Sequence, residues 1–377
     1  MRTIANPVLL LIMACSPAAT PPAADKTPAA PPAEPWTLEA VTPDTTDGIR
    51  ILVLHDMEGL SGQNDPRTFN FGEKEYALGQ QLLAADINAV VEGLYAGGAT
   101  EVWVVDGHGS GNPDPDVRRD LLDKRAQQVL RDSTFDAYFD LVTPKAYDAV
   151  AVVGMHAKTG SRGFASHTFT LGIGLAVNGR MITETELVGL SWGRQGIPVI
   201  FGSGDDRLAA DLAGMNWIEF VTVKKATAAD SAILRPVEEA HAELTAKART
   251  AVENLKAGKT RSMKVSMPMT AGLRAVYPAS LEMLDGIPGI NYKDSMVTFP
   301  ADSMKHAYDV MVRLVGVASG GYVRVLQRTV ATDPAGPGLM KKIGANMEQA
   351  WFDYESGRYK PPAPRTPPAG KKYHGYQ

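Results

Sequence analysis

The sequence is poor in cysteine and shows no marked excess of either charge. Cys15 is the only cysteine among the 377 residues, so no disulfide can form within the chain. Lys and Arg number 38 against 42 Asp and Glu, which gives a formal net charge of -4, and no Lys- or Arg-rich stripe stands out. We therefore expect no nucleic-acid partner, because such partners bind to basic surfaces.

Several common catalytic motifs are also absent. The sequence has no His-Glu-x-x-His motif, which excludes the zincin class of metallopeptidases. The glycine-rich segment 107–111, G-H-G-S-G, lacks the spacing of a serine-hydrolase nucleophile elbow, of a P-loop and of a dinucleotide-binding loop. Serine-hydrolase and nucleotide-binding functions are therefore not expected, and the glycines are interpreted as part of a tight turn.

The first fifteen residues have the pattern of an export signal. Arg2 supplies a positive charge, Val8 to Met13 form a short apolar run, and the end, I-M-A-C, resembles the lipobox of bacterial lipoproteins. The apolar run is far shorter than the roughly 20 residues of a membrane-spanning helix. We predict a lipoprotein signal peptide at residues 1–15 and a periplasmic protein that touches the membrane only through a lipid on Cys15. An ordinary secretory signal is the alternative, and it too would export the protein.

Composition and periodicity divide the rest of the chain. With 44% hydrophobic and 21% charged residues, the sequence is typical of a soluble globular protein. Residues 16–47 are rich in Ala and Pro and are predicted to form an extended tether, and residues 359–377 a disordered tail. Between them we predict an α/β metal-binding catalytic domain (48–215), a smaller C-terminal α+β subdomain (216–330) and a helical extension (331–358).

The fold class expected for the catalytic domain is α/β, with a mostly parallel sheet flanked by helices. Short apolar runs at Ile49 to Leu54, Glu101 to Val105 and Asp148 to Val153 are typical of buried parallel strands. A helical pattern from Gly72 to Tyr95 connects the first two runs, which is the strand-helix-strand signature of such sheets. A fourth strand is expected at Ile197 to Phe201.

The subdomain is predicted from a second set of patterns. A pattern rich in Glu, Lys and Ala over residues 228–256 predicts an exposed helix. Strands are expected at 263–267 and 296–299, and a closing helix at 302–317.

Polar residues follow three of the predicted strands. The first strand runs into H-D-M-E-G, with Asp56 and Glu58, the second into D-G-H-G, with His108, and the third into G-M-H-A, with His156. Functional groups of open α/β sheets lie beyond the carboxyl ends of the strands, so we expect these side chains to meet. Each residue alone would more often cap a turn or serve the structure. Together they form a mixed imidazole and carboxylate set, which suits zinc or a similar first-row ion better than calcium, and the lack of a nearby thiol argues against a structural zinc. Strand alternation turns His55 to the opposite face.

A series of short motifs resembles a known family. The motifs D-M-E-G, D-G-H-G, G-M-H-A, S-H-T, N-G-R followed by a glutamate, and G-D-D-R stand in this order between Ile49 and Gly320. The same order is found in the zinc-dependent D-aminopeptidases of the DppA type, a family of metallo-aminopeptidases. These enzymes assemble into ring-like homo-oligomers, so the resemblance implies a homo-oligomer here.

The resemblance also implies a role for particular residues. It implies a pair of zinc ions per chain, ligated by Asp56, Glu58, His108, His156 and Glu184. It implies that His167, in A-S-H-T-F-T, is the catalytic histidine. Glu186 is the alternative to Glu184, and the spacing back to Asn178 favours Glu184.

These features predict an enzyme, a zinc-dependent aminopeptidase that hydrolyses short peptides from the N-terminus. The resemblance alone implies a preference for D-residues such as D-Ala. In the hypothetical mechanism, two zinc ions bridged by Asp56 activate a shared water, whose pKa falls from 15.7 toward ~7. His167 would act as a general acid/base or as a donor to the oxyanion. Two alternatives stay open. One is a dinuclear metal phosphoesterase, for which Arg207 would have to supply the phosphate clamp, and the other is a non-catalytic envelope lipoprotein that binds peptide or metal.

Overall fold

The computed structural model describes residues 34–131 and 135–361. The predicted signal peptide, Cys15 and the predicted tether as far as residue 33 lie outside the described residues, and so does the tail from residue 362. Among the described helices, none is long and apolar enough to span a membrane.

The described residues form strands and helices in alternation. The strands are β1 (Trp36–Val41), β2 (Arg50–His55), β3 (Glu101–Asp106), β4 (Gln127–Gln128), β5 (Ala149–Val153), β6 (Ile173–Val177), β7 (Arg180–Ile182), β8 (Val199–Asp205), β9 (Glu219–Ala228), β10 (Ser231–Leu234), β11 (Thr260–Val265), β12 (Met269–Ala275), β13 (Asn291–Lys293) and β14 (Met296–Ala301). The helices are α1 (Tyr76–Gly97), α2 (Glu184–Gly193), α3 (Asp206–Asp211), α4 (Val237–Lys256), α5 (Met304–Ala318), α6 (Tyr322–Thr332) and α7 (Gly336–Glu355), with short 3-10 turns η1 (Pro66–Phe69), η2 (Glu282–Leu284) and η3 (Ser319–Gly321).

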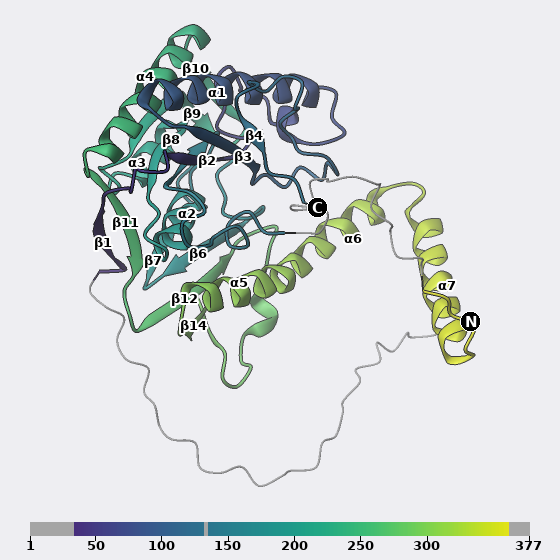
Figure 1. The fold of residues 1–377 in the computed structure, drawn as a ribbon. Coiled ribbons are helices and arrows are strands. Elements are labelled where there is room, and N and C mark those ends of the chain that lie inside the picture. The colour runs from purple at the N-terminus through teal and green to yellow at the C-terminus, as the bar shows by residue number, and fades with distance from the viewer. Residues whose placement is uncertain (1–33, 132–134, 362–377) are drawn as a thin grey trace, which may run out of the picture. The chain divides into compact units, whose positions relative to one another are not determined.

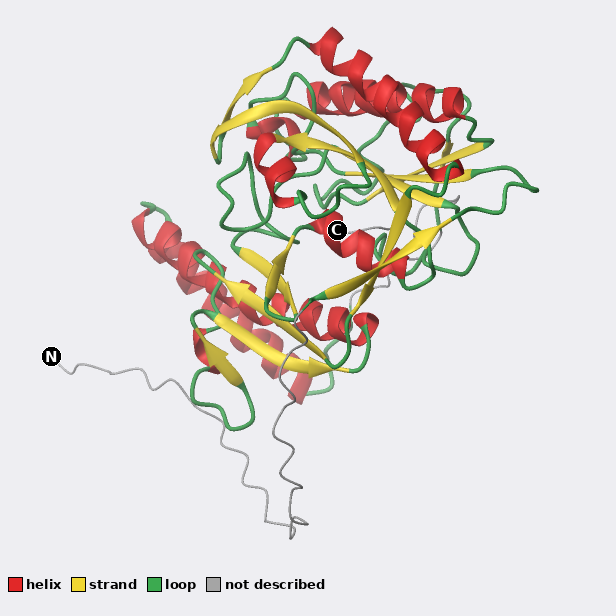
Figure 2. Cartoon of the chain, turned by 90° about the vertical axis from the view of Figure 1, so that its left-hand side faces the viewer, coloured by secondary structure: helices red, strands yellow, loops and turns green. Residues whose placement is uncertain are grey.

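The larger sheet has seven strands in the order β10-β9-β8-β5-β2-β3-β4. All neighbours in it are parallel except β10 and β9. Helices lie on both sides of this sheet (Figures 1 and 2). The four strands predicted from apolar runs are β2, β3, β5 and β8, so the prediction of a mostly parallel sheet flanked by helices is confirmed.

The side chains of β2 show why these runs form central strands. Ile51 and Val53 point into a core with α1 and α4, while Leu52 and Leu54 point into a second core shared with α2, α5 and the smaller sheet. All four are fully buried. Each such burial stabilises the fold by about 1.5–3 kcal/mol, which accounts for strands that are apolar on both faces.

Helix α4 differs from its prediction. Residues 219–228 and 231–234 form strands, so the helix begins only at Val237. It is not fully exposed, because Leu244, Val252 and Leu255 are buried. It packs side by side with α1 (Figure 1). Gly93 of α1 makes this close approach possible, since a Cβ there would lie 2.2 Å from the Thr245 carbonyl oxygen.

A smaller antiparallel sheet has the order β13-β14-β12-β6-β7. Its strands come from both sides of the predicted boundary at residue 215, because β6 and β7 precede it and β12 follows it. Likewise β9 and β10 lie beyond residue 215 but complete the larger sheet. Strand pairing therefore does not divide the chain where composition suggested. Helix α6 also crosses the predicted boundary at residue 330, and α7 lies within the predicted helical extension.

The end of the predicted tether is structured. Trp36–Val41 forms β1, which pairs antiparallel with β11 from Trp36 opposite Val265 to Val41 opposite Thr260. The prediction of an extended tether was therefore wrong for these six residues. Their W-T-L-E-A-V pattern is a strand pattern, and the Ala/Pro-rich composition around them concealed it.

Candidate metal centre and active site

Four of the predicted site residues lie together at the carboxyl ends of neighbouring strands. Asp56 and Glu58 follow β2, His108 follows β3 and His156 follows β5, and β2 lies between the other two strands. Asp56, Glu58 and His156 are buried, and the His108 side chain is only 10% exposed. Because the strands are parallel, their ends meet at one edge of the sheet and bring these side chains into contact.

Asp56 is the centre of this cluster. Its Oδ1 lies 2.9 Å from Nδ1 of His108, and its Oδ2 lies 3.3 Å from Nε2 of His156. Two sets of side chains that can hold a cation share this carboxylate. One is Asp56, Glu58 and His108, and the other is Asp56, His156 and Glu184. The two sets therefore meet at one aspartate.

Both ring nitrogens of His108 face acceptor oxygens, so the ring needs either a bound cation or a second proton. Nε2 lies 2.9 Å from the Phe69 carbonyl oxygen, to which it can only donate. Nδ1 faces Asp56 and also lies 3.3 Å from Oε2 of Glu58. A neutral imidazole has one N–H group, so donation to Phe69 leaves a lone pair pointed at two carboxylates. A metal ion between them, or a second proton, resolves this conflict.

In His156, Nδ1 is the nitrogen that faces a backbone carbonyl oxygen, and Nε2 is the nitrogen that faces carboxylates. Its Nδ1 donates to the Ala157 carbonyl oxygen at 3.0 Å. Nε2 lies between Asp56 and Glu184, 3.6 Å from Oε1 of Glu184, yet it forms no hydrogen bond. A buried nitrogen without a partner is costly, and this one points at two carboxylate oxygens. These residues therefore fit a metal ion. The hydrogen bond to the backbone carbonyl oxygen keeps the proton on Nδ1 and leaves the lone pair of Nε2 available to a metal.

The electrostatics of the cluster demand positive charge. Burial alone would lower the pKa of His156, but the carboxylates of Glu184 and Asp56 outweigh it and raise that pKa to about 10. Burial would raise the pKa of Asp56, yet its hydrogen bond with His108 and the charge of His156 hold it well below its usual range. Three carboxylates meet here, so a divalent ion or a proton must compensate them.

Glu184 reaches the cluster from outside the larger sheet. It is the first residue of α2, and its Oε1 accepts a hydrogen bond from the Phe169 backbone N–H at 2.7 Å. Glu186 points elsewhere, because its carboxylate accepts from the Thr183 backbone N–H at 2.8 Å in a capping box and pairs with Arg180. The structure thus brings Glu184 rather than Glu186 beside Asp56 and His156.

His167 lies against the cluster in the loop after β5. Its ring stacks on that of His156 with centroids 4.0 Å apart. Its Nδ1 donates to the Ala165 carbonyl oxygen at 2.6 Å, so in the neutral ring the lone pair is on Nε2. Burial and the neighbouring His156 lower the pKa of His167, which keeps the ring neutral at neutral pH. Its ring nitrogen also lies within reach of Glu58 and His156 as a third potential ligand set.

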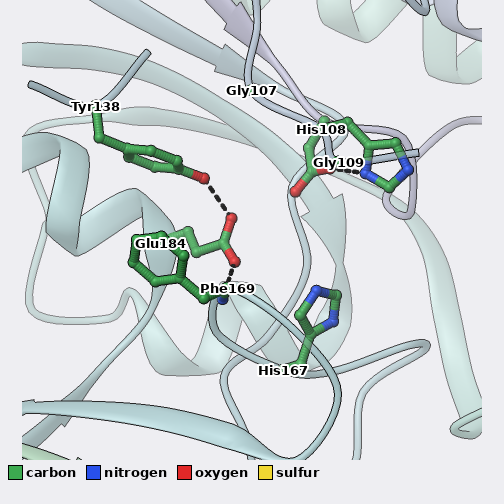
Figure 3. Close-up of a pocket in the computed structure, with 8 residues that line it drawn as sticks. Gly107, His108, Gly109, Tyr138, His167, Phe169 and Glu184 are labelled. Carbon is green, nitrogen blue, oxygen red and sulfur yellow. Dashed lines mark hydrogen bonds and ion pairs between the residues drawn. The ribbon is translucent and has the colours of Figure 1, made fainter. Parts of the chain in front are cut away.

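A pocket opens onto these residues (Figure 3). Its lining consists of Asp56, Gly107, His108, Gly109, Tyr138, His167, Phe169 and Glu184. Gly107 belongs to the predicted tight turn, and it packs close to β2, since a Cβ there would lie 2.9 Å from the Leu54 side chain. The pocket gives a substrate access to the carboxylates and imidazoles at its base.

Sequence reasoning missed Tyr138. Its hydroxyl donates to Oε2 of Glu184 at 2.5 Å (Figure 3). Burial and the adjacent carboxylate raise the pKa of Tyr138, so the hydroxyl keeps its proton and remains a donor. Tyr138 lies in an irregular segment without a recognisable motif, and no sequence signal links it to Glu184, 46 positions later. With Phe169, it satisfies both oxygens of Glu184.

We expect Tyr138→Phe to weaken zinc binding about 10- to 100-fold, because it removes the hydroxyl that orients Glu184 and leaves the ring in place. Zinc affinity would be measured by titration against a competing chelator. Tyr308→Phe is the matched control, because Tyr308 is also buried and donates its hydroxyl to Asp136 instead. Equal loss of affinity in both variants would mean that the hydroxyl of Tyr138 has no particular role in holding Glu184.

A buried lysine supports the loop that carries Glu58. Lys224 of β9 donates through Nζ to the Glu58 carbonyl oxygen at 2.5 Å and to Oε1 of Gln63 at 2.8 Å. Burial lowers the pKa of Lys224 to about 7. The lysine lies on a strand that no motif marks, so it too could not be found from the sequence.

The other described histidines belong to none of these ligand sets. His55 is fully buried, and its pKa falls to about 3, mainly through burial. Nε2 of His241 pairs with the buried Asp86 at 3.0 Å. It does so because α4 packs on α1. His374 lies outside the described residues.

Comparisons with known proteins agree with this arrangement. A family model described as D-aminopeptidase matches residues 49–313. The D-aminopeptidase of Bacillus subtilis (strain 168) is 25% identical over 278 residues, which cover 72% of this chain and 98% of the relative. The fold resembles a solved structure of the Zn-dependent D-aminopeptidase DppA from Bacillus subtilis, described as a self-compartmentalizing protease. That likeness has a TM-score of 0.63 at 22% identity and covers 72% of this chain and 98% of the other.

The family match covers most of the chain and includes all six predicted site residues. It begins at β2 and ends within α5, so it takes in both sheets as well as the pocket. The chain therefore belongs to the D-aminopeptidase family of peptidases.

Proposed function

We propose that this protein is a zinc-dependent D-aminopeptidase that binds two zinc ions per chain and releases D-residues such as D-Ala from the N-terminus of short peptides. One observation carries the proposal. Two sets of potential ligands share Asp56 at the base of a pocket, and a buried nitrogen of His156 points at two carboxylates without a hydrogen bond. Buried polar atoms of a purely structural cluster are normally hydrogen-bonded, whereas this nitrogen lies 3.3 Å from Oδ2 of Asp56 without a hydrogen bond.

The residues would divide between two ions. Asp56, Glu58 and His108 would hold one, and Asp56, His156 and Glu184 the other. Mixed imidazole and carboxylate donors without thiolate suit a catalytic zinc site, and the relative of known structure is described as Zn-dependent. Bound zinc supplies Lewis acidity, which lowers the pKa of water toward ~7 and polarises a carbonyl group.

The chain's own residues supply proton transfer and orientation. The lone pair on Nε2 of His167 faces the pocket side of the cluster in a neutral ring, so it can accept a proton and later return it to the leaving amine. As a donor to an oxyanion, the same nitrogen would first have to be protonated. The lowered pKa of His167 disfavours that state, so we favour the acid/base role.

Stereochemistry, location and assembly are part of the proposal. The D-preference is supported by the family description, and self-association by the description of the Bacillus relative as self-compartmentalizing. Location in the periplasm, with a lipid on Cys15, is supported by the export-signal pattern of residues 1–15 alone. The phosphoesterase alternative gains no support, because neither Arg nor Lys is among the residues that line the described pocket, and Arg207 is not one of them.

The deciding experiment measures zinc by mass spectrometry and, in parallel, hydrolysis of matched tripeptides that begin with D-Ala or L-Ala. We expect about two zinc ions per chain and faster release of D-Ala. An N-acetylated D-Ala peptide is the control, and it should resist cleavage if a free amino end is required. Cleavage of a phosphodiester but of no peptide would favour the phosphoesterase, and a protein that is inactive even with zinc restored would favour a binding protein.

A further inference from the structure

Helix α7 presents a row of apolar side chains to solvent. Every residue of α7 except Gly336 and Asp353 is exposed. Its large apolar residues are 44% to 69% exposed, and five of them are Met340, Ile343, Met347, Trp351 and Tyr354. The family match ends at residue 313, so this helix is an addition beyond the catalytic fold. In Figure 1 it follows α6 at the yellow end of the chain.

These five residues form one stripe along the helix. They are separated by three, four, four and three positions, the spacing that places side chains on the same face of an α-helix. The polar residues Lys342, Gln349 and Asp353 lie on the opposite face, about half a turn away at 100° per residue. An exposed apolar stripe of this kind is typical of a surface that binds a partner helix.

The stripe is symmetric about Met347, which points to a second copy as the partner. Ile343 and Trp351 each lie four residues from Met347, and Met340 and Tyr354 each lie seven residues away. Two copies of α7 packed antiparallel around a two-fold axis at Met347 would therefore place Ile343 opposite Trp351, and Met340 opposite Tyr354. Such a two-fold interface uses the same patch on both subunits, as this stripe requires.

The charges beside the stripe distinguish antiparallel from parallel pairing. Lys341 and Glu355 lie on the same flank of the stripe, near opposite ends of the helix. In an antiparallel pair, Lys341 of each copy faces Glu355 of the other, which gives two attractive contacts. In a parallel pair the Lys341 ends of the two helices would lie side by side, and so would the Glu355 ends, so neither attractive contact could form. The charge pattern therefore favours the antiparallel arrangement.

We propose that α7 is a self-association helix, which pairs antiparallel with α7 of a second copy of this chain around Met347. The surface lies outside the family match, so it would act in addition to any contact between catalytic folds. A 20-residue helix is about 30 Å long, enough for the whole stripe to be covered by its copy.

The first test measures the mass of the full chain in solution by analytical ultracentrifugation. Met347→Glu brings two carboxylates together at the two-fold axis, and we expect the mass of the assembly to fall by half. Met283→Glu is the matched control, because Met283 is 70% exposed against 69% for Met347 and lies in η2. The control should keep the mass of the wild type. An unchanged mass for Met347→Glu would overturn the proposal.

The second test examines the orientation. Lys341→Glu and Glu355→Lys should each raise the dissociation constant of the pair about tenfold or more, since each replaces two attractive contacts by two repulsive ones. The double variant Lys341→Glu/Glu355→Lys should restore wild-type association. Failure of the double variant to recover would overturn the antiparallel arrangement. A wild type that stays unpaired but binds phosphatidylglycerol vesicles through Met347 would replace the second copy with a lipid surface.

Discussion

Asp56→Asn is expected to abolish both zinc sites and to slow peptide hydrolysis by about 10³-fold or more. The two carboxylate oxygens of Asp56 face different histidines, Oδ1 toward His108 and Oδ2 toward His156, so a single side chain serves both ligand sets. An amide keeps the shape but loses the charge and directs an NH₂ group at one of the histidines. Lewis-acid stabilisation contributes several kcal/mol, and each 1.36 kcal/mol changes the rate tenfold.

The measurements are zinc per chain by mass spectrometry and kcat/KM on a D-Ala peptide. Asp86→Asn is the control, because Asp86 is also fully buried and hydrogen-bonded, to the Ser61 N–H and to His241, but belongs to no ligand set among the described residues. It should keep its zinc even if it lowers stability. Retention of two zinc ions by Asp56→Asn would contradict the bridging role of Asp56.

His167→Ala is expected to lower kcat about 10²-fold or more while the zinc content stays at the wild-type value. Removal of the imidazole deletes the group that accepts a proton near the pocket, but it leaves the contacts of Asp56 with His108 and His156 intact. Zinc content is measured beside kcat because His167 forms a third possible ligand set with Glu58 and His156. Loss of one zinc ion would show that His167 is a ligand rather than the proton-transfer group.

His306→Ala is the control for this variant. His306 is about half exposed on α5 and pairs with Asp302, and it does not line the pocket. Its replacement should leave both kcat and zinc content unchanged. A wild-type rate in His167→Ala would remove His167 from the mechanism altogether.

The strand-end residues could be predicted from the sequence because two local rules act together. Apolar runs identify buried strands, and the residues that follow parallel strands must gather at one edge of the sheet. Asp56, Glu58, His108 and His156 needed nothing more. Glu184 and His167 came from the resemblance alone, since Glu184 begins the helix that follows β7 and His167 lies in an irregular loop. No local pattern shows that either one turns toward β5.

The errors have the same origin. The helix over residues 228–256 was taken as exposed because its composition is charged, but its apolar residues repeat with helical spacing and pack on α1. The division at residue 215 failed to match the sheets, because β6, which also pairs with β7, pairs on its other side with β12, about ninety residues later in the chain. Pairing between strands that are distant in sequence depends on how the whole chain packs, which composition does not encode.

The sequence by itself determined the parallel sheet, the four ligand candidates at its edge and the absence of competing catalytic motifs, because periodicity and strand ends are local properties. The resemblance suggested Asp56 as the shared residue and Glu184 over Glu186, and the tertiary structure supplied the contacts that support both. The tertiary structure alone decided that Tyr138 holds the Glu184 carboxylate and that Lys224 holds the Glu58 carbonyl oxygen. These contacts join segments up to 166 residues apart, and only the packed chain brings such segments within hydrogen-bonding distance.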